Sequence, residues 1–175
     1  MDNSSDIRIR AWHPGDAEQL VLHANNLNVA RFMADTFPHP YTLDAAVKFI
    51  GLASQDDPMR LFAIEVDGSA CGGIGIHPQK DIQSRNAEIG YWLSEAYWNK
   101  GITSAALHLI IPYAFRHFEI ERLFARPFGS NKASQKLLEN CGFVLEARIK
   151  DGFFKHGRFD DELIYGLRRS DFKNA

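Results

Sequence analysis

The spacing of apolar residues predicts alternating strands and helices, beginning with a strand at residues 7–11, where apolar and polar side chains alternate. Apolar positions three and four residues apart then predict a helix over roughly 15–25, and the spacing continues through residues 29–33. The segment Pro38–Pro40 ends this pattern, because proline lacks the amide donor and restricts the residue before it. Thr42 is typical of an N-cap, so we expect a further helix to begin there.

The middle of the chain carries three strand signals. Two of them, Leu61–Val66 and Cys71–Ile76, are separated by Asp67-Gly68, which is typical of a hairpin turn. A polar stretch over residues 79–86 separates them from the third, Ala87–Leu93. This run predicts antiparallel strands joined by short connections.

A long apolar segment predicts a helix over about 103–118, which is apolar on most sides, as is typical of a helix buried against a sheet. Pro112 inside it is expected to remove one backbone hydrogen bond and kink the helix. A short strand follows at 123–125. Because a helix connects this strand to the one at 87–93, the two strands are expected to pair in parallel.

The last part of the chain predicts a helix over 131–140 and two final strands, 143–149 and 163–167. Gly142 fits the left-handed position that ends a helix. A polar loop around residues 156–158 is expected to join the two strands.

These elements predict an α/β fold built on a mixed, mostly antiparallel central sheet of about seven strands. We expect a single domain over residues 7–170, with flexible tails at 1–6 and 171–175. The length of 175 residues fits one domain. The chain is 45% hydrophobic and 24% charged, close to the globular average, which excludes a disordered or fibrous protein.

Charge and cysteine content narrow the classes of function. With 20 Lys+Arg and 22 Asp+Glu the net charge is −2, so a chain-wide basic surface for direct nucleic-acid binding is not expected. Cys71 and Cys141 lack CxxC partners and are expected to be small buried hydrophobes. Because Met1–Asp6 is polar and no apolar run approaches about 18 residues, we expect a soluble cytoplasmic protein with no membrane association.

The segment most informative about chemistry is Ala87–Ala106, where a strand ends, a loop containing Lys100 and Gly101 follows, and a long helix begins. Unpaired amides at a helix N-terminus bind anions, and glycine lets a phosphate approach the backbone closely. An ordinary capped turn is the alternative. The segment lacks the P-loop pattern, and Gly73-Ile74-Gly75 lacks the third glycine of a dinucleotide fingerprint. That glycine pair instead predicts a closely packed strand or a bulge.

Four segments in this order resemble the GCN5-related N-acetyltransferase (GNAT) superfamily, and within it the branch of the Rim-type ribosomal-protein N-terminal acetyltransferases. They are Cys71–Gly75, Ala87–Leu93, Tyr97–Ile102 and the segment from Asn131-Lys132-Ala133-Ser134 to Glu139–Phe143. The resemblance spans residues 7 to about 167. It implies helices on both faces of the sheet, with one parallel strand pair that splays apart.

The resemblance also implies that acetyl-CoA is the co-substrate, with no metal. The pantetheine arm is expected to insert beside the splayed strand, and the loop amides to hold the diphosphate. The residues implied in cofactor binding are Tyr91, Trp92, Leu93, Trp98, Asn99, Lys100, Gly101, Ile102, Thr103, Ser104 and Asn131. Two positions depart from the family pattern, because Thr103 replaces a Gly or Ala and Ala105 replaces a glutamate common in this branch.

Acyl transfer from a thioester to an amine needs a proton acceptor, and the resemblance assigns this role to Glu88, directly or through water. A structural carboxylate paired with an arginine is the alternative. Ser134 matches a position sometimes given the role of general acid, and its alternative is an ordinary hydroxyl in the first turn of a helix. No two of the seven histidines are spaced i, i+4 with an acidic partner, so we expect no metal site.

The acceptor is expected to be a primary amine, either a protein N-terminus or a small molecule. The segments expected to select it are Phe32–Tyr41 and a loop over Phe153–Asp161, where acidic residues would attract a cation or simply form a solvated cluster. A monomer and a homodimer both fit the sequence. A non-catalytic acyl-CoA-binding module and a nucleotide-binding protein that uses the same loop are the competing functions.

Overall fold

The predicted strands form one seven-stranded sheet in the computed structural model, which describes residues 6–172. Their order is β1-β2-β3-β4-β5-β7-β6. The β4–β5 pair is parallel, and the pairs β1–β2, β2–β3, β5–β7 and β6–β7 are antiparallel, which confirms the predicted mixed sheet. The bounds are β1 Ile7–Arg10, β2 Leu61–Val66, β3 Ser69–Pro78, β4 Asn86–Leu93, β5 Arg122–Ala125, β6 Val144–Lys155 and β7 Arg158–Arg168.

Five α-helices accompany these strands in the described residues: α1 Ala17–Ala24, α2 Leu27–Ala30, α3 Leu43–Ala53, α4 Ile102–His117 and α5 Lys132–Asn140. Short 3₁₀ turns occupy η1 Pro14–Asp16, η2 Asp81–Gln83 and η3 Glu95–Tyr97. By backbone contacts the chain groups into two compact units. Among the described residues, unit 1 comprises 6–75 and 91–106, and unit 2 comprises 76–90 and 107–172.

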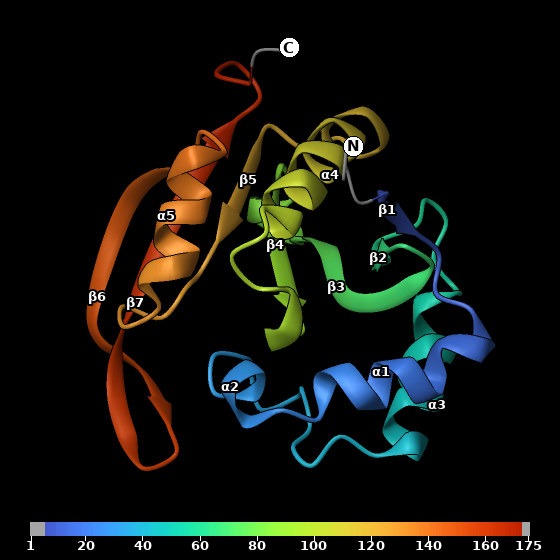
Figure 1. Ribbon diagram of the computed structural model, residues 1–175. Helices are drawn as coiled ribbons and strands as arrows, with labels where there is room; N and C mark the ends of the chain where they lie inside the picture. Colours follow the sequence, from blue (N-terminus) through green and yellow to red (C-terminus); the bar gives the residue numbers. More distant parts are fainter. Residues whose placement is uncertain (1–5, 173–175) are drawn as a thin grey trace, which may run out of the picture. The chain divides into compact units, whose positions relative to one another are not determined.

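The core of unit 1 forms where α1 and α3, side by side in Figure 1, present their small and branched residues. Leu20, Ala46 and Ile50 are buried in one cluster with Ala63 and Ala70 of the β2–β3 hairpin. The N-cap prediction is confirmed, since the Thr42 hydroxyl accepts a hydrogen bond from the Ala45 amide at 3.2 Å. Asp67 and Gly68 have φ values of 49° and 83° and form the predicted hairpin turn.

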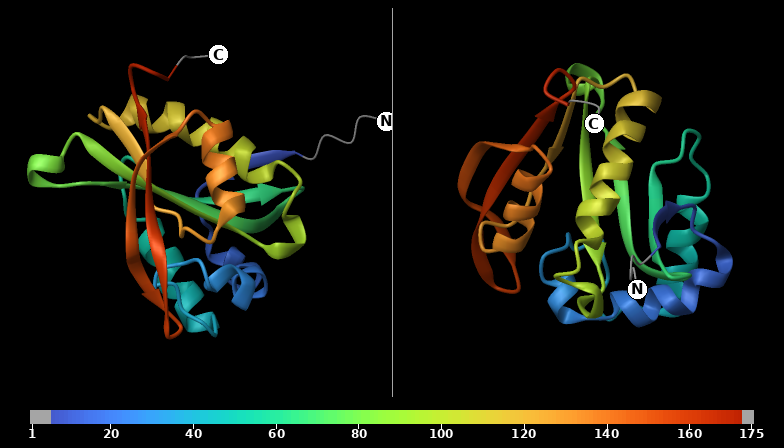
Figure 2. Two further views of the ribbon diagram at one scale, coloured as in Figure 1. Left: turned by 90° about the vertical axis from the view of Figure 1, so that its left-hand side faces the viewer. Right: turned by 45° about the horizontal axis from the view of Figure 1, so that its top comes forward.

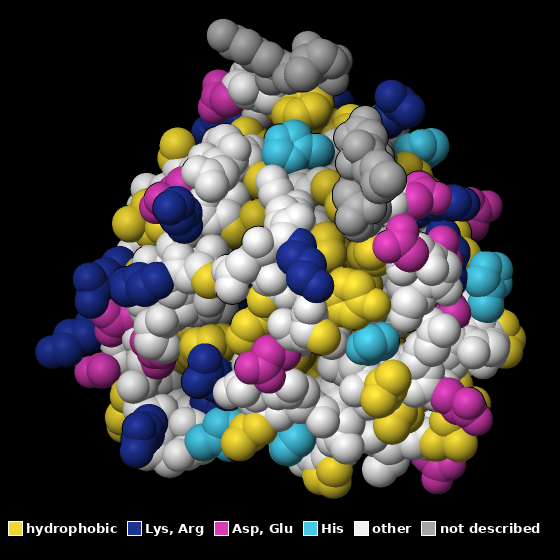
Figure 3. All heavy atoms as spheres, in the orientation of Figure 1, with side chains coloured by type: hydrophobic (Ala, Val, Ile, Leu, Met, Phe, Trp, Pro, Cys, Tyr) yellow, Lys and Arg dark blue, Asp and Glu magenta, His cyan; other side chains and the backbone are white. Residues whose placement is uncertain are grey.

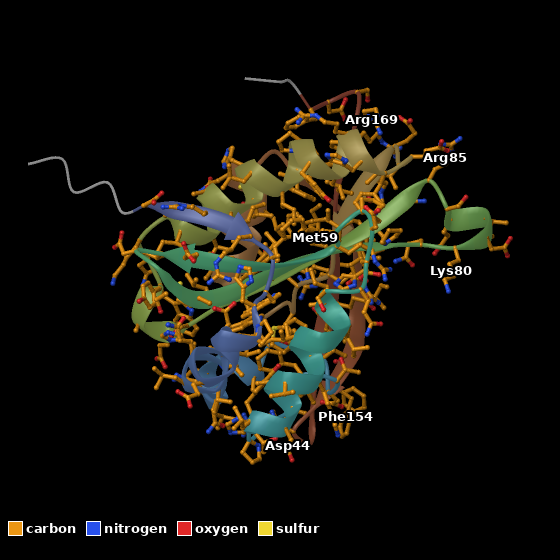
Figure 4. The ribbon with its side chains drawn as sticks, turned by 90° about the vertical axis from the view of Figure 1, so that its right-hand side faces the viewer. Asp44, Met59, Lys80, Arg85, Phe154 and Arg169 are labelled. Atoms are coloured by element: carbon orange, nitrogen blue, oxygen red, sulfur yellow. The ribbon has the colours of Figure 1, made fainter. Side chains whose placement is uncertain are left out.

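Unit 2 contains the β6–β7 ribbon with α5 beside it (Figure 2). Gly142, at φ 86°, ends α5 as predicted, and the Phe143 amide donates to the Leu138 carbonyl at 3.0 Å. Unit 2 also holds the turn between β3 and β4, where Lys80 and Arg85 project outward (Figure 4).

Three expectations from the sequence are corrected. The helix predicted over 15–25 is a 3₁₀ turn followed by α1, and residues 27–30 form the separate helix α2. Cys71 is buried, and burial raises the pKa of its thiol to about 11, but Cys141 at the end of α5 is only half-buried. The loop predicted over Phe153–Asp161 belongs mostly to β6 and β7, which leaves only the turn residues His156 and Gly157 between them.

Candidate active site

The glycine-rich strand β3 packs closely against the end of β4 in unit 1. A Cβ placed on Gly72 would lie 2.6 Å from the Trp92 carbonyl oxygen, and one on Gly73 would lie 2.6 Å from Trp92 Nε1. Such distances leave no room for a side chain, which confirms at Gly73 the close packing predicted from Gly73 and Gly75. The Trp92 indole is buried in the unit 1 core, in edge contact with Phe37. A contact from Trp92 to a ligand is therefore limited to its main chain.

The loop after β4 is held by its own side chains. The Trp98 indole donates to the Leu93 carbonyl at 2.8 Å, which folds the loop back onto the strand end. The Lys100 ammonium donates to the Ala96 carbonyl at 2.9 Å and lies over the Tyr97 ring. Because Lys100 has these two contacts, it stabilises the loop whether or not an anion is bound.

The backbone of this loop turns sharply into α4. Asn99 and Gly101 both have left-handed φ values, 59° and 75°. The Ala105 amide donates to the Gly101 carbonyl at 3.0 Å, so the amides of Ile102 and Thr103 precede the first hydrogen bond of the helix. Successive amides in such a turn, together with the positive end of the helix dipole, form a concave site for an anion. The residues present therefore fit a bound diphosphate.

Two side-chain networks anchor the start of this loop, and neither was found from the sequence. His23 Nδ1 lies 3.1 Å from the Ser94 hydroxyl, and Ser94 is buried at the junction of β4 and η3. Burial lowers the pKa of His23 below its ordinary value. Glu95 accepts hydrogen bonds from the side-chain amides of Asn28 and Asn26, which lower the pKa of its carboxyl group. Both contacts join residues more than sixty positions apart, so no local pattern marks them.

In unit 2, the predicted proton acceptor Glu88 lies on β4 and is paired with Arg126, just past the end of β5. The Arg126 Nε and Nη2 atoms each lie 3.1 Å from one oxygen of the Glu88 carboxylate. Glu88 is therefore paired with an arginine, as the alternative interpretation of the sequence predicted. Each oxygen keeps a lone pair, so the pairing does not block a further hydrogen bond to Glu88.

Asn131 and Ser134 occupy the N-terminus of α5 in unit 2. The Asn131 side-chain oxygen caps the helix by accepting from the Ser134 amide at 3.2 Å. The Gln135 side-chain amide donates to the Phe128 and Gly129 carbonyls and thereby holds the preceding loop. Ser134 therefore lies in the first helical turn, and its role as an acid stays a prediction.

The two segments expected to select the acceptor are partly structural. Tyr41 is buried in the unit 1 core, where its ring contacts Phe37. In unit 2, Asp160 accepts from the Ser130 amide, and Asp161 is paired with Arg148. Figure 3 shows Lys and Arg side chains interspersed with Asp and Glu over α5 and β6, which is typical of a solvated mixed-charge surface.

The predicted site residues divide between the units. Tyr91, Trp92, Leu93 and the loop over 98–104 belong to unit 1, whereas Glu88, Asn131 and Ser134 belong to unit 2. Within residues 6–172 there is no cluster of three His, Cys, Asp or Glu side chains suited to a metal ion. In the same range no helix has the length and apolar character needed to span a bilayer.

A tight glycine-backed strand end, an amide-lined turn and a mixed sheet with a parallel strand pair are the features expected of an acetyltransferase of the GNAT class. The chain belongs to this family, since the family model described as "Acetyltransferase (GNAT) domain" matches residues 6–144. Acetyl-CoA is the acetyl donor of this family, and the chain is accordingly an acetyl-CoA-dependent N-acetyltransferase.

Individual relatives cover nearly the whole chain. A Bacillus subtilis (strain 168) protein described as "Putative ribosomal N-acetyltransferase YdaF" is 29% identical over 95% of this chain and 93% of its own length. A spermidine N(1)-acetyltransferase of Vibrio cholerae is 24% identical over 98% of each chain. The crystal structure of RimL, a ribosomal-protein α-N-acetyltransferase in complex with coenzyme A, shares the fold with a TM-score of 0.80. It is 20% identical and covers 95% of each chain.

Proposed function

We propose that the protein transfers the acetyl group of acetyl-CoA to a primary amine by direct attack of the amine on the thioester. The observation that carries this proposal is the turn at Asn99–Gly101, which presents the first amides of α4 as a diphosphate site. This turn is shaped or lined by Trp98, Lys100 and Thr103. The proposed contacts to the acetyl donor are completed by Ser104 and Asn131. The Trp92 or Leu93 amide polarises the thioester carbonyl.

Glu88 is the proposed proton acceptor. An α-amine has a pKa near 7.7–8.0 and a lysine-like amine near 10.4, so either is partly or mostly protonated at neutral pH and must lose a proton before attack. A carboxylate with one free lone pair on each oxygen accepts this proton directly or through water. Ser134 is the proposed donor to the leaving thiolate, a smaller role because a thiol ionises near pH 8.5.

For the acceptor we propose the α-amine of a protein N-terminus, and a polyamine is the second candidate. The names of the relatives support both, since one is described as a "Ribosomal-protein-serine acetyltransferase" and another as a spermidine N(1)-acetyltransferase. We further propose that the enzyme works in the cytoplasm as a monomer or a homodimer. The family match favours transfer over the non-catalytic binding module.

An acceptor screen tests the proposal. Acetyl-CoA is incubated with a peptide that has a free N-terminus, a lysine peptide with a blocked N-terminus, and spermidine, while thiol release and acetylation are followed by absorbance and mass spectrometry. The expected result is acetylation of at least one amine. Thiol release no faster than in buffer with all three acceptors would contradict the proposal.

Glu88→Gln is expected to lower kcat/KM by about 10²-fold or more, because the amide cannot accept the proton. Glu146→Gln is the matched control. It removes another carboxylate of unit 2 that pairs with an arginine, but Glu146 lies on β6 and pairs with Arg122 of β5, not with Arg126. An unchanged rate in Glu88→Gln would remove Glu88 from the mechanism.

A further inference from the structure

One guanidinium in unit 2 bridges two carboxylates. Besides its two contacts to Glu88, Arg126 presents Nη1 to Glu162 Oε1 at 3.3 Å. The Glu162 side chain is 14% exposed, whereas Glu88 is 25% and Arg126 is 44% exposed. The more buried carboxylate, on β7, is therefore the fixed end of the bridge, and Glu88 is the end nearer to solvent.

The position of Glu162 depends on a glycine in the neighbouring strand. The register of β6 shifts between Ile149 and Phe153, and Gly152 lies within this irregularity. A Cβ on Gly152 would lie 2.8 Å from Glu162 Cβ and 3.2 Å from its Oε2. Because Gly152 has no side chain, the Glu162 side chain can occupy the space beside it.

We propose that Arg126 is a positioning residue for Glu88, held by Glu162 in the space left by Gly152. This inference rests on the proposed role of Glu88 as proton acceptor. The two-pronged contact from Nε and Nη2 fixes the plane of the Glu88 carboxylate, and the Nη1 contact to Glu162 fixes the guanidinium. The Glu88 carboxylate is thereby held in one orientation, in which the lone pairs that Arg126 does not use remain available to an approaching amine.

The charge balance of the cluster supports the same role. Without Arg126, Glu88 and Glu162 would both lose the cation that is hydrogen-bonded between them. The hydrogen bond to Glu88 raises the pKa of Arg126 above its ordinary value. Other charged or titratable groups on elements beside Glu88 include His77 on β3, next to Gly90, and Arg122 on β5, which is paired with Glu146.

The test uses NMR of the full chain labelled with ¹³C at glutamate side-chain carboxyl carbons. The Glu88 resonance is identified by its absence in Glu88→Gln, and its chemical shift at neutral pH is compared between the parent protein and the variants. In Arg126→Gln the Glu88 resonance is expected to move, because the carboxylate loses both hydrogen bonds from Arg126. Arg126→Lys, which keeps the charge but loses the two-pronged contact, is expected to move it less than Arg126→Gln does, and it supplies a second variant should Arg126→Gln not fold.

Arg122→Gln is the matched control, since Arg122 is an arginine of β5 that pairs with a different glutamate, Glu146, and the Glu88 resonance of this variant is expected to match the parent protein. With an acceptor from the screen, Arg126→Gln should also lower kcat several-fold and leave KM for acetyl-CoA unchanged. An unmoved Glu88 resonance in Arg126→Gln overturns the positioning role, even where Glu88→Gln loses activity as proposed. An unchanged rate in Glu88→Gln overturns both the positioning role and the proposed base.

Discussion

The two ends of β4 are held by different forces. At the Trp92 end, the strand is fixed by close packing against Gly72 and Gly73, with the indole buried in the unit 1 core. At the Glu88 end, the side chain is fixed by ion pairing to Arg126, on a partly exposed surface of unit 2. Close packing does not depend on pH and does not tolerate a larger side chain. An ion pair on a partly exposed surface tolerates a larger side chain but depends on the charge of both partners. Substitutions at the two ends are therefore expected to affect different observables.

The largest effect on stability is expected from Gly73→Ala. The new Cβ would meet the Trp92 indole at 2.6 Å, and overpacking of this kind costs about 1–3 kcal/mol of the free energy of unfolding. Chemical denaturation measures this loss. Gly51→Ala in α3 is the control, because nothing lies within 4 Å of its Cβ position and alanine favours a helix by roughly 0.5–1 kcal/mol. Equal free energies of unfolding for Gly73→Ala and Gly51→Ala would contradict the claim that close packing fixes the Trp92 end of β4.

A smaller effect, on ligand affinity, is expected from Gly101→Ala. At φ 75° an alanine is strained by about 1–2 kcal/mol, and relief of this strain would distort the amide turn. The dissociation constant for coenzyme A, measured by calorimetry, should rise roughly tenfold. Gly157→Ala introduces the same strain at φ 74° in the β6–β7 turn, so it should reduce stability without changing the affinity. If Gly101→Ala and Gly157→Ala both bind coenzyme A with the affinity of the parent protein, the turn at Gly101 does not hold the diphosphate.

The smallest effect concerns pH and His23. Because burial lowers the pKa of His23, the unfolded chain binds a proton near pH 6.5 while the folded protein still holds a neutral imidazole. The free energy of unfolding therefore falls as the pH drops through this range. Urea titrations between about pH 7 and pH 5 should give a flatter curve for His23→Gln. His156→Gln, in the exposed β6–β7 turn, should keep the parent slope, and a parent-like slope in His23→Gln would contradict the argument.

Much of the fold could be predicted from the sequence, because local signals determine it. Asp67-Gly68, the cap at Thr42 and the helix end at Gly142 each depend on residues within a few positions, and all three were predicted correctly. The apolar glycine strand also predicted close packing. These features require only backbone preferences and the period of the apolar residues.

The features that sequence patterns missed depend on distant partners. Residues 153–161 were predicted to be a loop, centred on the polar residues 156–158. The structure places most of them in strands, where Phe153 packs on Phe128 and Phe154 pairs with Phe159. The bridge from Glu88 through Arg126 to Glu162 joins residues 36 and 38 positions apart, which no periodic pattern reveals.

The central claim is that the amides at the start of α4 hold the diphosphate of the acetyl donor. The most direct measurement is a crystal structure of the protein grown with coenzyme A. The account predicts diphosphate oxygens within about 2.7–3.2 Å of the amides between Gly101 and Thr103. A diphosphate bound at any other part of the chain would contradict it.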